Sequence, residues 1–239
     1  MLLAKYYDYL IDWSARLARE IPFLAELIPG KRVLVAACGT GGHLPALAAA
    51  GFEVTGIDSD AEMVEIARSK SACRVEQLAL EDCLRLGQNF AAVLCLGNVL
   101  PNLPEPGRME TAIAQMHAVL APGGVCFTQN LNYDRRWREK ARFFPLLSGR
   151  KGKEEIVLFK FADYGESYID FHTAFVSRPA ADSRWTSTVE SSRQRPVFQQ
   201  DLERACRLAG FRELRAWGSY GGEPFDIERS SDLLLAAWK

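Results

Sequence analysis

The sequence lacks the features that mark several large classes of protein. Its 239 residues carry 29 Lys and Arg against 30 Asp and Glu, so the net charge is -1 and no general attraction to nucleic acid or anionic lipid is expected. No apolar run approaches the length needed to cross a bilayer. Residues 1–20 mix charges into every turn without a small-residue cleavage site, so we expect no secretion signal.

Cysteine and histidine are sparse and scattered. The six cysteines form no CxxC pair, which is typical of free thiols in a reducing compartment, and we expect a cytoplasmic protein. The three histidines are equally dispersed, so no metal site is predicted. A phosphate-binding G-x-x-x-x-G-K-[ST] loop is missing too, which excludes the nucleotide hydrolases built on it.

What is present is an alternation of strand-like and helix-like segments. "RVLVAAC", "FEVTGID" and "FAAVLCLG" are typical of buried strands, and "LPALAAA", "AEMVEIARSK" and "METAIAQMHAVL" of helices. "RELRAWGS" and "DLLLAAW" predict two further strands near the end of the chain. This rhythm predicts an α/β fold with a mostly parallel, Rossmann-like sheet and helices on both faces.

We expect a single domain over residues 1–239, with residues 1–30 as an N-terminal helical cap. Residues 132–196 differ in their residue pattern, which is aromatic and basic at first and then alternates like exposed strands. This pattern predicts an insertion with antiparallel strands that serves as a substrate lid. Aromatic residues alternate along it, and one face either walls a pocket or forms only the insertion's own small core. These aromatic residues are Phe159, Phe161, Tyr164, Tyr168 and Phe171.

A glycine-rich bend follows the first predicted strand. Gly39, Gly41 and Gly42 lack side chains where a helix begins, so a ligand can lie against the backbone. Asp58 ends the next strand, where its carboxylate can accept hydrogen bonds from a ribose diol. Leu44 stands where a dinucleotide fingerprint needs its third glycine, which argues against a nicotinamide-dependent oxidoreductase. The bend therefore predicts a nucleoside ligand.

This bend resembles motif I of the class I S-adenosylmethionine-dependent methyltransferases. The segments "YLIDWSAR", "ACGTGGH", "GFEVTGIDSDAEM", "CLGNVLPNL" and "NYD" are most similar to the glycine and sarcosine N-methyltransferases and related small-molecule methyltransferases. The resemblance implies a seven-stranded sheet whose last strand is antiparallel, with the small β insertion over the site. It also implies S-adenosyl-L-methionine as cofactor and in-line methyl transfer to nitrogen or oxygen of a small-molecule acceptor.

The resemblance also assigns cofactor-binding positions. It places Asp58 on the ribose, Asp82 on the adenine amino group with Glu81 as a rival, and the Leu96 and Gly97 backbone at the sulfonium end. The full predicted set is Ala37, Gly39, Gly41, Asp58, Ser59, Met63, Asp82, Cys83, Leu96 and Gly97. His43 follows the bend and is interpreted as a first-turn helix residue rather than a base.

Polar residues on loops at the same sheet edge are candidates for catalysis and acceptor binding. We predict Tyr7, Asn98 and Tyr133 as catalytic residues. We predict Asn102, Tyr164 and Tyr220 as substrate contacts. For the tyrosines the competing interpretation is packing with a satisfied hydroxyl, and for Asn98 it is a turn residue.

The sequence departs from the family pattern at two positions, one in motif I and one at the expected acceptor site. Val35 stands where motif I normally has an acidic residue. Leu131 stands where the glycine N-methyltransferases carry an arginine that clamps the substrate carboxylate, and a leucine cannot pair with a carboxylate. A protein of the same fold that binds S-adenosylmethionine or S-adenosylhomocysteine without catalysis therefore stays open as an alternative. So does a homo-oligomer, since the sequence does not decide the oligomeric state.

Overall fold

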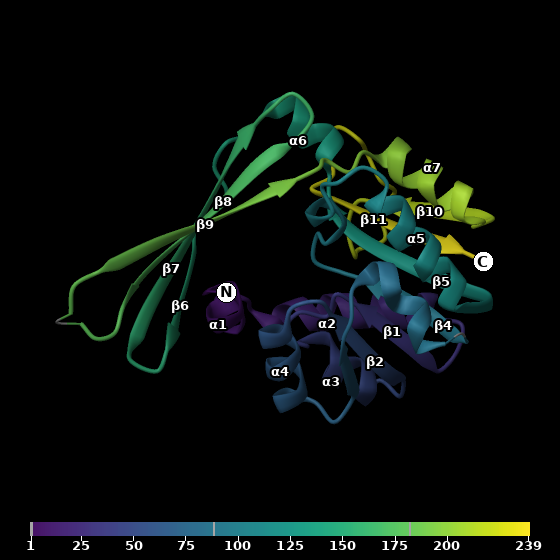
Figure 1. The fold of residues 1–239 in the computed structure, drawn as a ribbon, viewed down its shortest axis with the longest axis horizontal. Helices are drawn as coiled ribbons and strands as arrows, with labels where there is room; N and C mark the ends of the chain where they lie inside the picture. The colour runs from purple at the N-terminus through teal and green to yellow at the C-terminus, as the bar shows by residue number, and fades with distance from the viewer. Residues whose placement is uncertain (1, 88, 182) are drawn as a thin grey trace.

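The computed structural model describes residues 2–87, 89–181 and 183–239 and contains two β-sheets (Figure 1). The main sheet has seven strands in the order β10-β11-β5-β4-β1-β2-β3. Its strands are β1 (Arg32–Ala36), β2 (Glu53–Asp58), β3 (Arg74–Gln77), β4 (Phe90–Cys95), β5 (Leu120–Leu131), β10 (Glu213–Trp217) and β11 (Asp232–Trp238). Only β11 runs antiparallel to its neighbours β5 and β10. The predicted fold class, including the antiparallel last strand, is confirmed.

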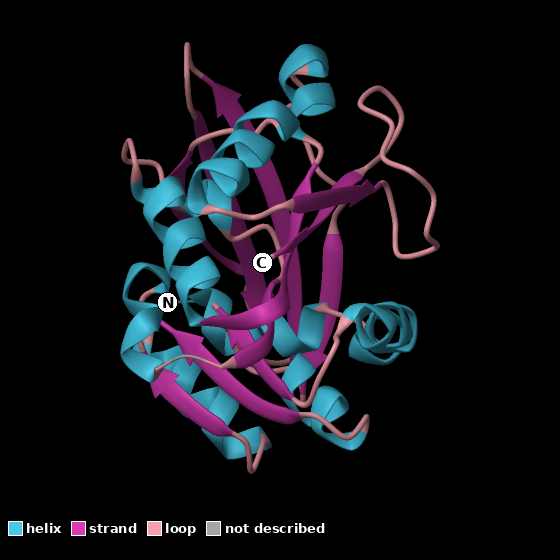
Figure 2. Cartoon of the chain, turned by 90° about the vertical axis from the view of Figure 1, so that its right-hand side faces the viewer, coloured by secondary structure: helices cyan, strands magenta, loops and turns pink. Residues whose placement is uncertain are grey.

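Helices cover both faces of this sheet (Figure 2). The helices of the described chain are α1 (Leu2–Leu10), α2 (Trp13–Leu27), α3 (His43–Ala49), α4 (Ala61–Lys70), the 3-10 turns η1 (Leu80–Leu86) and η2 (Leu100–Asn102), α5 (Arg108–Val119), α6 (Tyr133–Glu139) and α7 (Gln199–Ala209). Strand β1 is buried on both sides because successive side chains point to opposite faces. Leu34 packs with α5 and α7, whereas Val33 and Val35 pack with α2, α3 and α4.

A four-stranded antiparallel sheet, in the order β6-β7-β8-β9, projects away from the main domain (Figure 1). Its strands are β6 (Leu147–Lys151), β7 (Glu154–Tyr164), β8 (Ile169–Arg178) and β9 (Thr186–Gln194). One face packs on α1, where Ile156, Leu158 and Phe175 bury Tyr6 and Leu10. Together with α6, these strands occupy the segment that the sequence marks as an insertion.

The first two helices connect the insertion to the glycine bend. The Tyr6 hydroxyl of α1 donates a 2.7 Å hydrogen bond to Glu154 of β7. Two residues later on the same helix, Asp8 accepts hydrogen bonds from the Thr40 hydroxyl at 2.8 Å and the Trp13 indole at 2.9 Å. The N-terminal helices therefore lie across the carboxyl edge of the main sheet. Within the described ranges, no helix has both the length and the apolar character that spanning a bilayer requires.

Candidate functional site

The glycine bend lies between the end of β1 and the start of α3. Gly39 has a φ of 55°, and a Cβ built there meets nothing within 4 Å, so the surface over it is open. A Cβ on Gly41 would lie 2.8 Å from the Ala67 Cβ, and one on Gly42 would overlap the Trp13 ring. Open space against the backbone is thus found at Gly39. At Gly41 and Gly42 the lack of a side chain also permits close packing against Ala67 and Trp13.

Asp58 lies directly beside this open surface. Its Oδ2 accepts a 2.8 Å hydrogen bond from the Gly39 N–H, and its Oδ1 accepts one of 3.0 Å from the Asp60 N–H. Burial raises the pKa of the Asp58 carboxyl, and these backbone hydrogen bonds oppose the rise. The carboxylate is therefore held rigidly at the carboxyl end of β2, with acceptor capacity left for a ligand's hydroxyl groups.

The remaining predicted cofactor residues lie on the loops that follow β1 to β4. Ala37 has a φ of 55°, and Met63 is buried in α4, whose first turn is capped by Asp60. The Ser59 carbonyl accepts a hydrogen bond from Gln77 at 3.2 Å. Leu96 is buried, and Gly97 has a φ of 87° with open space where a side chain would be.

The adenine end has two candidate carboxylates, and the structure separates them. Glu81 forms an ion pair with Arg108, whereas Asp82 forms no ion pair within the described ranges. Asp82 is thus the carboxylate available to a ligand. Cys83 next to it is fully buried, and burial raises the pKa of its thiol to about 12, so only its backbone can serve a ligand.

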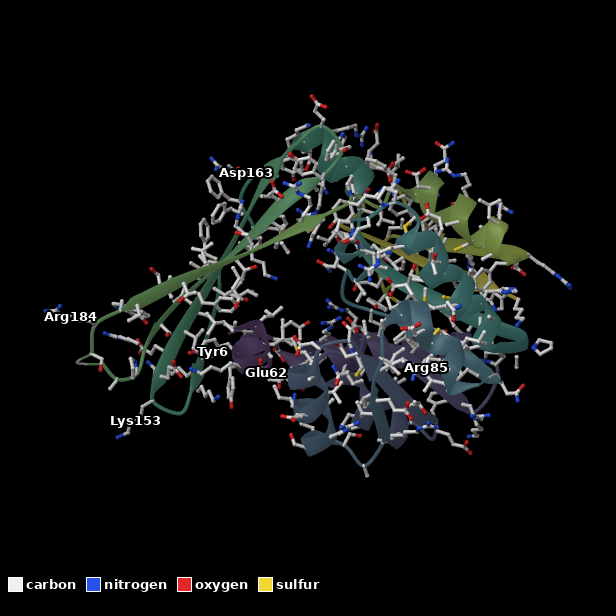
Figure 3. All side chains as sticks on the ribbon, viewed as in Figure 1. Tyr6, Glu62, Arg85, Lys153, Asp163 and Arg184 are labelled. Carbon is white, nitrogen blue, oxygen red and sulfur yellow. The ribbon has the colours of Figure 1, made fainter. Side chains whose placement is uncertain are left out.

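A cavity of about 730 Å³ opens between the carboxyl edge of the main sheet and the inner face of the insertion. Four groups of segments line it. The lining residues include Tyr7, Arg16, Arg19 and Glu20 from the first two helices; Gly97, Asn98, Asn102, Gln129 and Leu131 from the segments after β4 and at the end of β5; Arg136, Phe144, Lys160, Phe171 and Gln194 from the insertion; and Tyr220, Ser231 and Asp232 near β11. Gly97 joins the cavity to the loops predicted to hold the cofactor. Figure 3 shows side chains of the main domain and of the insertion on either side of the space between these two parts.

Two of the three predicted catalytic residues share one hydrogen-bond network. Asn98, at a φ of 63°, donates through Nδ2 to the Tyr133 hydroxyl at 3.0 Å, and its Oδ1 accepts from the Leu131 N–H at 3.0 Å. Burial raises the pKa of Tyr133 to about 12. The Tyr133 side chain is 2% exposed and is not among the residues lining the cavity. Asn98 lines the cavity, and the buried Tyr133 hydroxyl holds the Asn98 side chain in place.

Tyr7, like Asn98, is a predicted catalytic residue that lines the cavity. Its hydroxyl accepts a 3.4 Å hydrogen bond from Arg16, which also donates to Glu20 at 2.8 Å. Glu20 contacts His43 at 2.6 Å. Burial alone would raise the pKa of Glu20, but the contact with His43 and the charge of Arg16 hold it below its usual value. His43, on the first turn of α3, thus holds the buried Glu20 carboxylate of α2 in place.

The predicted substrate residues differ in position. Tyr220 lines the cavity between Phe23 and Phe127, and its hydroxyl is buried without a hydrogen-bond partner among the described residues. Asn102 lines it too, with its Oδ1 accepting a 3.1 Å bond from Gln194. Tyr164 instead packs on Trp137 outside the cavity lining, and its hydroxyl donates to the Ala141 carbonyl at 3.1 Å.

Several cavity residues escaped the sequence interpretation, among them Gln129, Arg136, Lys160 and Asp232. Gln129 lies in the polar end of β5, between Thr128 and Asn130, and Asp232 begins the otherwise apolar β11. These polar positions near the carboxyl edge were the available signal. Gln129 accepts from the Gly97 N–H at 2.6 Å and donates to Asp232 at 2.8 Å. The alternating aromatic residues also divide between the two faces: Phe171 lines the cavity, whereas Phe159 and Phe161 pack in a row with Phe143 and His172.

Known proteins match this arrangement. Residues 33–124 match a family model described as a methyltransferase domain. A glycine/sarcosine N-methyltransferase of Parasynechococcus marenigrum (strain WH8102) is 28% identical over 227 residues, covering 90% of this chain and 76% of the relative. One from Aphanothece halophytica is 32% identical over 138 residues, which are 54% of this chain and about half, 52%, of the relative.

Residues 33–124 therefore match a methyltransferase domain, and the chain is similar over most of its length to an N-methyltransferase. Its fold is that of SAM-bound CalS10, an amino pentose methyltransferase from Micromonospora echinaspora: the TM-score is 0.72 at 21% identity, covering 96% of this chain and 92% of the other. The methyltransferase match and this SAM-bound neighbour support the predicted cofactor, S-adenosyl-L-methionine. The open backbone at Gly39 and Gly97, with the Asp58 carboxylate at the end of β2, fits its amino acid tail and ribose.

Proposed function

We propose that this methyltransferase methylates a nitrogen or oxygen atom of a small-molecule acceptor held in the cavity between the main sheet and the insertion. The observation that carries the proposal is the continuity between Gly97 and the cavity. Gly97 lies on the loop after β4 with open space beside it, and the same residue lines the 730 Å³ space. A cavity of this size suits a metabolite rather than a nucleic acid strand.

The chemistry needs positioning more than activation. S-adenosylmethionine, when bound, supplies a methyl group that its sulfonium already activates. Gly39, Asp58 and the Gly97 backbone would hold the cofactor, and the acceptor's proton would pass to water as the acceptor takes up the methyl group. The protein contributes alignment of the acceptor and exclusion of bulk water, and alignment alone is worth several kcal/mol in model systems.

Residues of this chain have distinct roles in that task. We assign cofactor binding to Gly39, Asp58, Asp82 and the Gly97 backbone, and acceptor contact to Tyr7 and the unpartnered hydroxyl of Tyr220. Leu131 lines the cavity at the position where glycine N-methyltransferases carry arginine, so we do not expect glycine as the preferred acceptor. The free state of all six cysteines supports a cytoplasmic location.

Formation of S-adenosylhomocysteine tests the proposal. Purified protein with S-adenosylmethionine should form it in the presence of some members of a panel of small amines and alcohols. Asp58→Ala should weaken cofactor affinity by ~1–3 kcal/mol, because the ribose hydroxyls lose their acceptor. Asp60→Asn is the matched control, since an asparagine still caps α4. Cofactor binding without turnover on any acceptor would instead support a protein that only binds the cofactor.

A further inference from the structure

Two half-buried cations in the cavity have no carboxylate partner among the described residues. Arg136 of α6 and Lys160 of β7 both line the cavity, and neither forms an ion pair within the described ranges. Their neighbours on α6 behave differently: Arg135 pairs with Glu139, and Arg138 with Glu228. On α6, the cation that lines the cavity is thus the one that differs from these two paired arginines.

The two cations lie against adjoining aromatic rings. The Arg136 guanidinium carbon is 4.6 Å from the centroid of Phe144, and the Lys160 ammonium is 6.0 Å from that of Phe171. The two rings meet edge to face with centroids 5.0 Å apart. Both positive groups thus belong to one aromatic-backed wall, on the inner face of the insertion.

Keeping Lys160 in this place is costly for the unliganded chain. It is half-buried, and burial lowers the pKa of its ammonium with no carboxylate to oppose the shift. A buried cation without a counterion is unfavourable unless another molecule supplies the opposite charge. The cavity's remaining cations do not need such a molecule, because Arg16 pairs with Glu20 and Arg19 is exposed.

Negative charge lies near the carboxyl edge of the main sheet. Asp232, the first residue of β11, accepts from Gln129 at 2.8 Å and from the Ser231 hydroxyl at 2.9 Å. Gln129 in turn holds the Gly97 N–H, so Asp232 is two hydrogen bonds away from the loop predicted to face the sulfonium. The cavity therefore has a cationic wall on the insertion and a carboxylate on the edge where the methyl group arrives.

We propose that the acceptor carries an oxyanion, a carboxylate or a phosphate, that Arg136 and Lys160 bind, with its methyl-accepting amine directed toward Gly97 and Asp232. This inference rests on the proposed function and narrows it to acceptors that bear both charges. It also accounts for Leu131: the positive charge that the glycine enzymes place at that position is supplied here from the insertion.

Binding of matched acid and neutral probes to the protein saturated with S-adenosylhomocysteine tests the inference. Calorimetric titrations use 4-aminobutyrate and 6-aminohexanoate against their amides, and O-phosphoethanolamine against ethanolamine. We expect at least one anionic probe to bind about 10-fold or more tightly than its neutral counterpart, the usual effect of a charge-assisted hydrogen bond. The pair with the larger ratio identifies the oxyanion as carboxylate or phosphate.

Variants show which residues cause the preference for anionic over neutral probes. Lys160→Met and Arg136→Gln should each remove most of it without changing the affinity of the neutral probes, and Lys160→Arg should retain it. Arg135→Gln on the same helix and Lys153→Met at the far end of the insertion (Figure 3) are the controls and should bind as wild type does. Thermal melting shows that each variant is folded.

Three results would overturn the inference: equal binding of acid and neutral probes, no binding of any anionic probe, or a preference that survives in the Lys160→Met/Arg136→Gln double variant. These outcomes are separable from failure of the proposed function. Methyl transfer to neutral amines at a rate unaffected by both substitutions leaves the proposed function intact and removes only the oxyanion site. Absence of turnover on every acceptor removes the function, while the titrations still decide whether the oxyanion binds.

Discussion

The Tyr133 hydroxyl donates a 3.0 Å hydrogen bond to Oε1 of Gln194, and these residues stand at opposite ends of the insertion. Tyr133 is the first residue of α6, and Gln194 is the last of β9. The same hydroxyl accepts from Asn98, and Gln194 donates to Asn102, so both ends of the insertion are tied to the loops after β4. This buried network fixes the cavity's outer wall relative to the edge where the cofactor's methyl group is expected.

Removing the Tyr133 hydroxyl should therefore weaken both the fold and turnover. In Tyr133→Phe the Asn98 amide and the Gln194 carbonyl lose a buried partner, which should cost ~1–3 kcal/mol of unfolding free energy. Urea unfolding measures that loss, and initial rates of S-adenosylhomocysteine formation measure the effect on kcat. Tyr168→Phe, elsewhere in the insertion, should change neither quantity. Wild-type stability and rate in Tyr133→Phe would show that the network does not position the site.

The sequence predicts the elements of the main sheet well because each is marked by its own residues. Apolar runs such as Val33 to Ala36 are long enough for a strand buried on both faces, and Gly51 and Gly210 mark where helices end. The glycine bend and Asp58 could be placed together because neighbouring parallel strands end at one edge. Local chemistry determines these features, so one sequence suffices to find them.

The cavity wall could not be predicted in the same way. Strand β7 carries apolar or aromatic residues on both faces, so alternation alone does not reveal which face packs inward. Lys160 turns into the cavity, while Tyr164, four residues further along, is covered by Trp137. Nor does the sequence show that Trp13, 29 positions before Gly42, packs against that glycine. Such contacts arise from tertiary packing and leave no local pattern.

Two glycines of the bend should respond to alanine for different reasons. Gly39→Ala has room for its methyl group but must keep a positive φ, which costs ~1–2 kcal/mol, and the methyl group enters the space predicted for the cofactor. Gly42→Ala has an ordinary φ of -56°, but its Cβ overlaps the Trp13 ring, which should cost ~1–3 kcal/mol through overpacking. Calorimetric titration with S-adenosylhomocysteine should show the larger loss of affinity per unit of lost stability in Gly39→Ala. Equal ratios in the two variants would contradict an open ligand surface at Gly39.

Cofactor affinity should fall in acid because of Asp58. Burial raises the pKa of this carboxyl above its ordinary value of 3.8, so it takes up a proton at a higher pH than an exposed aspartate does. The ionised form accepts two ribose hydroxyls better than the neutral form, so affinity is highest above the raised pKa and decreases as the pH falls through it. Titrations with S-adenosylhomocysteine from pH 7 downward measure this decrease. Asp58→Asn should bind more weakly at pH 7 and lose this component of the pH dependence. A wild-type slope identical to that of Asp58→Asn would assign the titration to another group.

Replacing Lys160 should stabilise the fold at neutral pH, whereas most substitutions destabilise a protein. Burial lowers the pKa of its ammonium below 10.5 in the folded chain, so between that lowered pKa and 10.5 the unfolded chain binds more protons and stability rises with pH. At neutral pH the folded chain bears the full cost of the buried charge. Lys160→Met should therefore be more stable by ~1 kcal/mol near pH 7, and its advantage should shrink as the pH approaches 10.5. Urea unfolding at pH 7 and pH 10 measures both values, and exposed Lys153→Met should show neither effect. A less stable Lys160→Met at pH 7 would mean that the chain itself compensates the charge, leaving no deficit for an acceptor's oxyanion to fill.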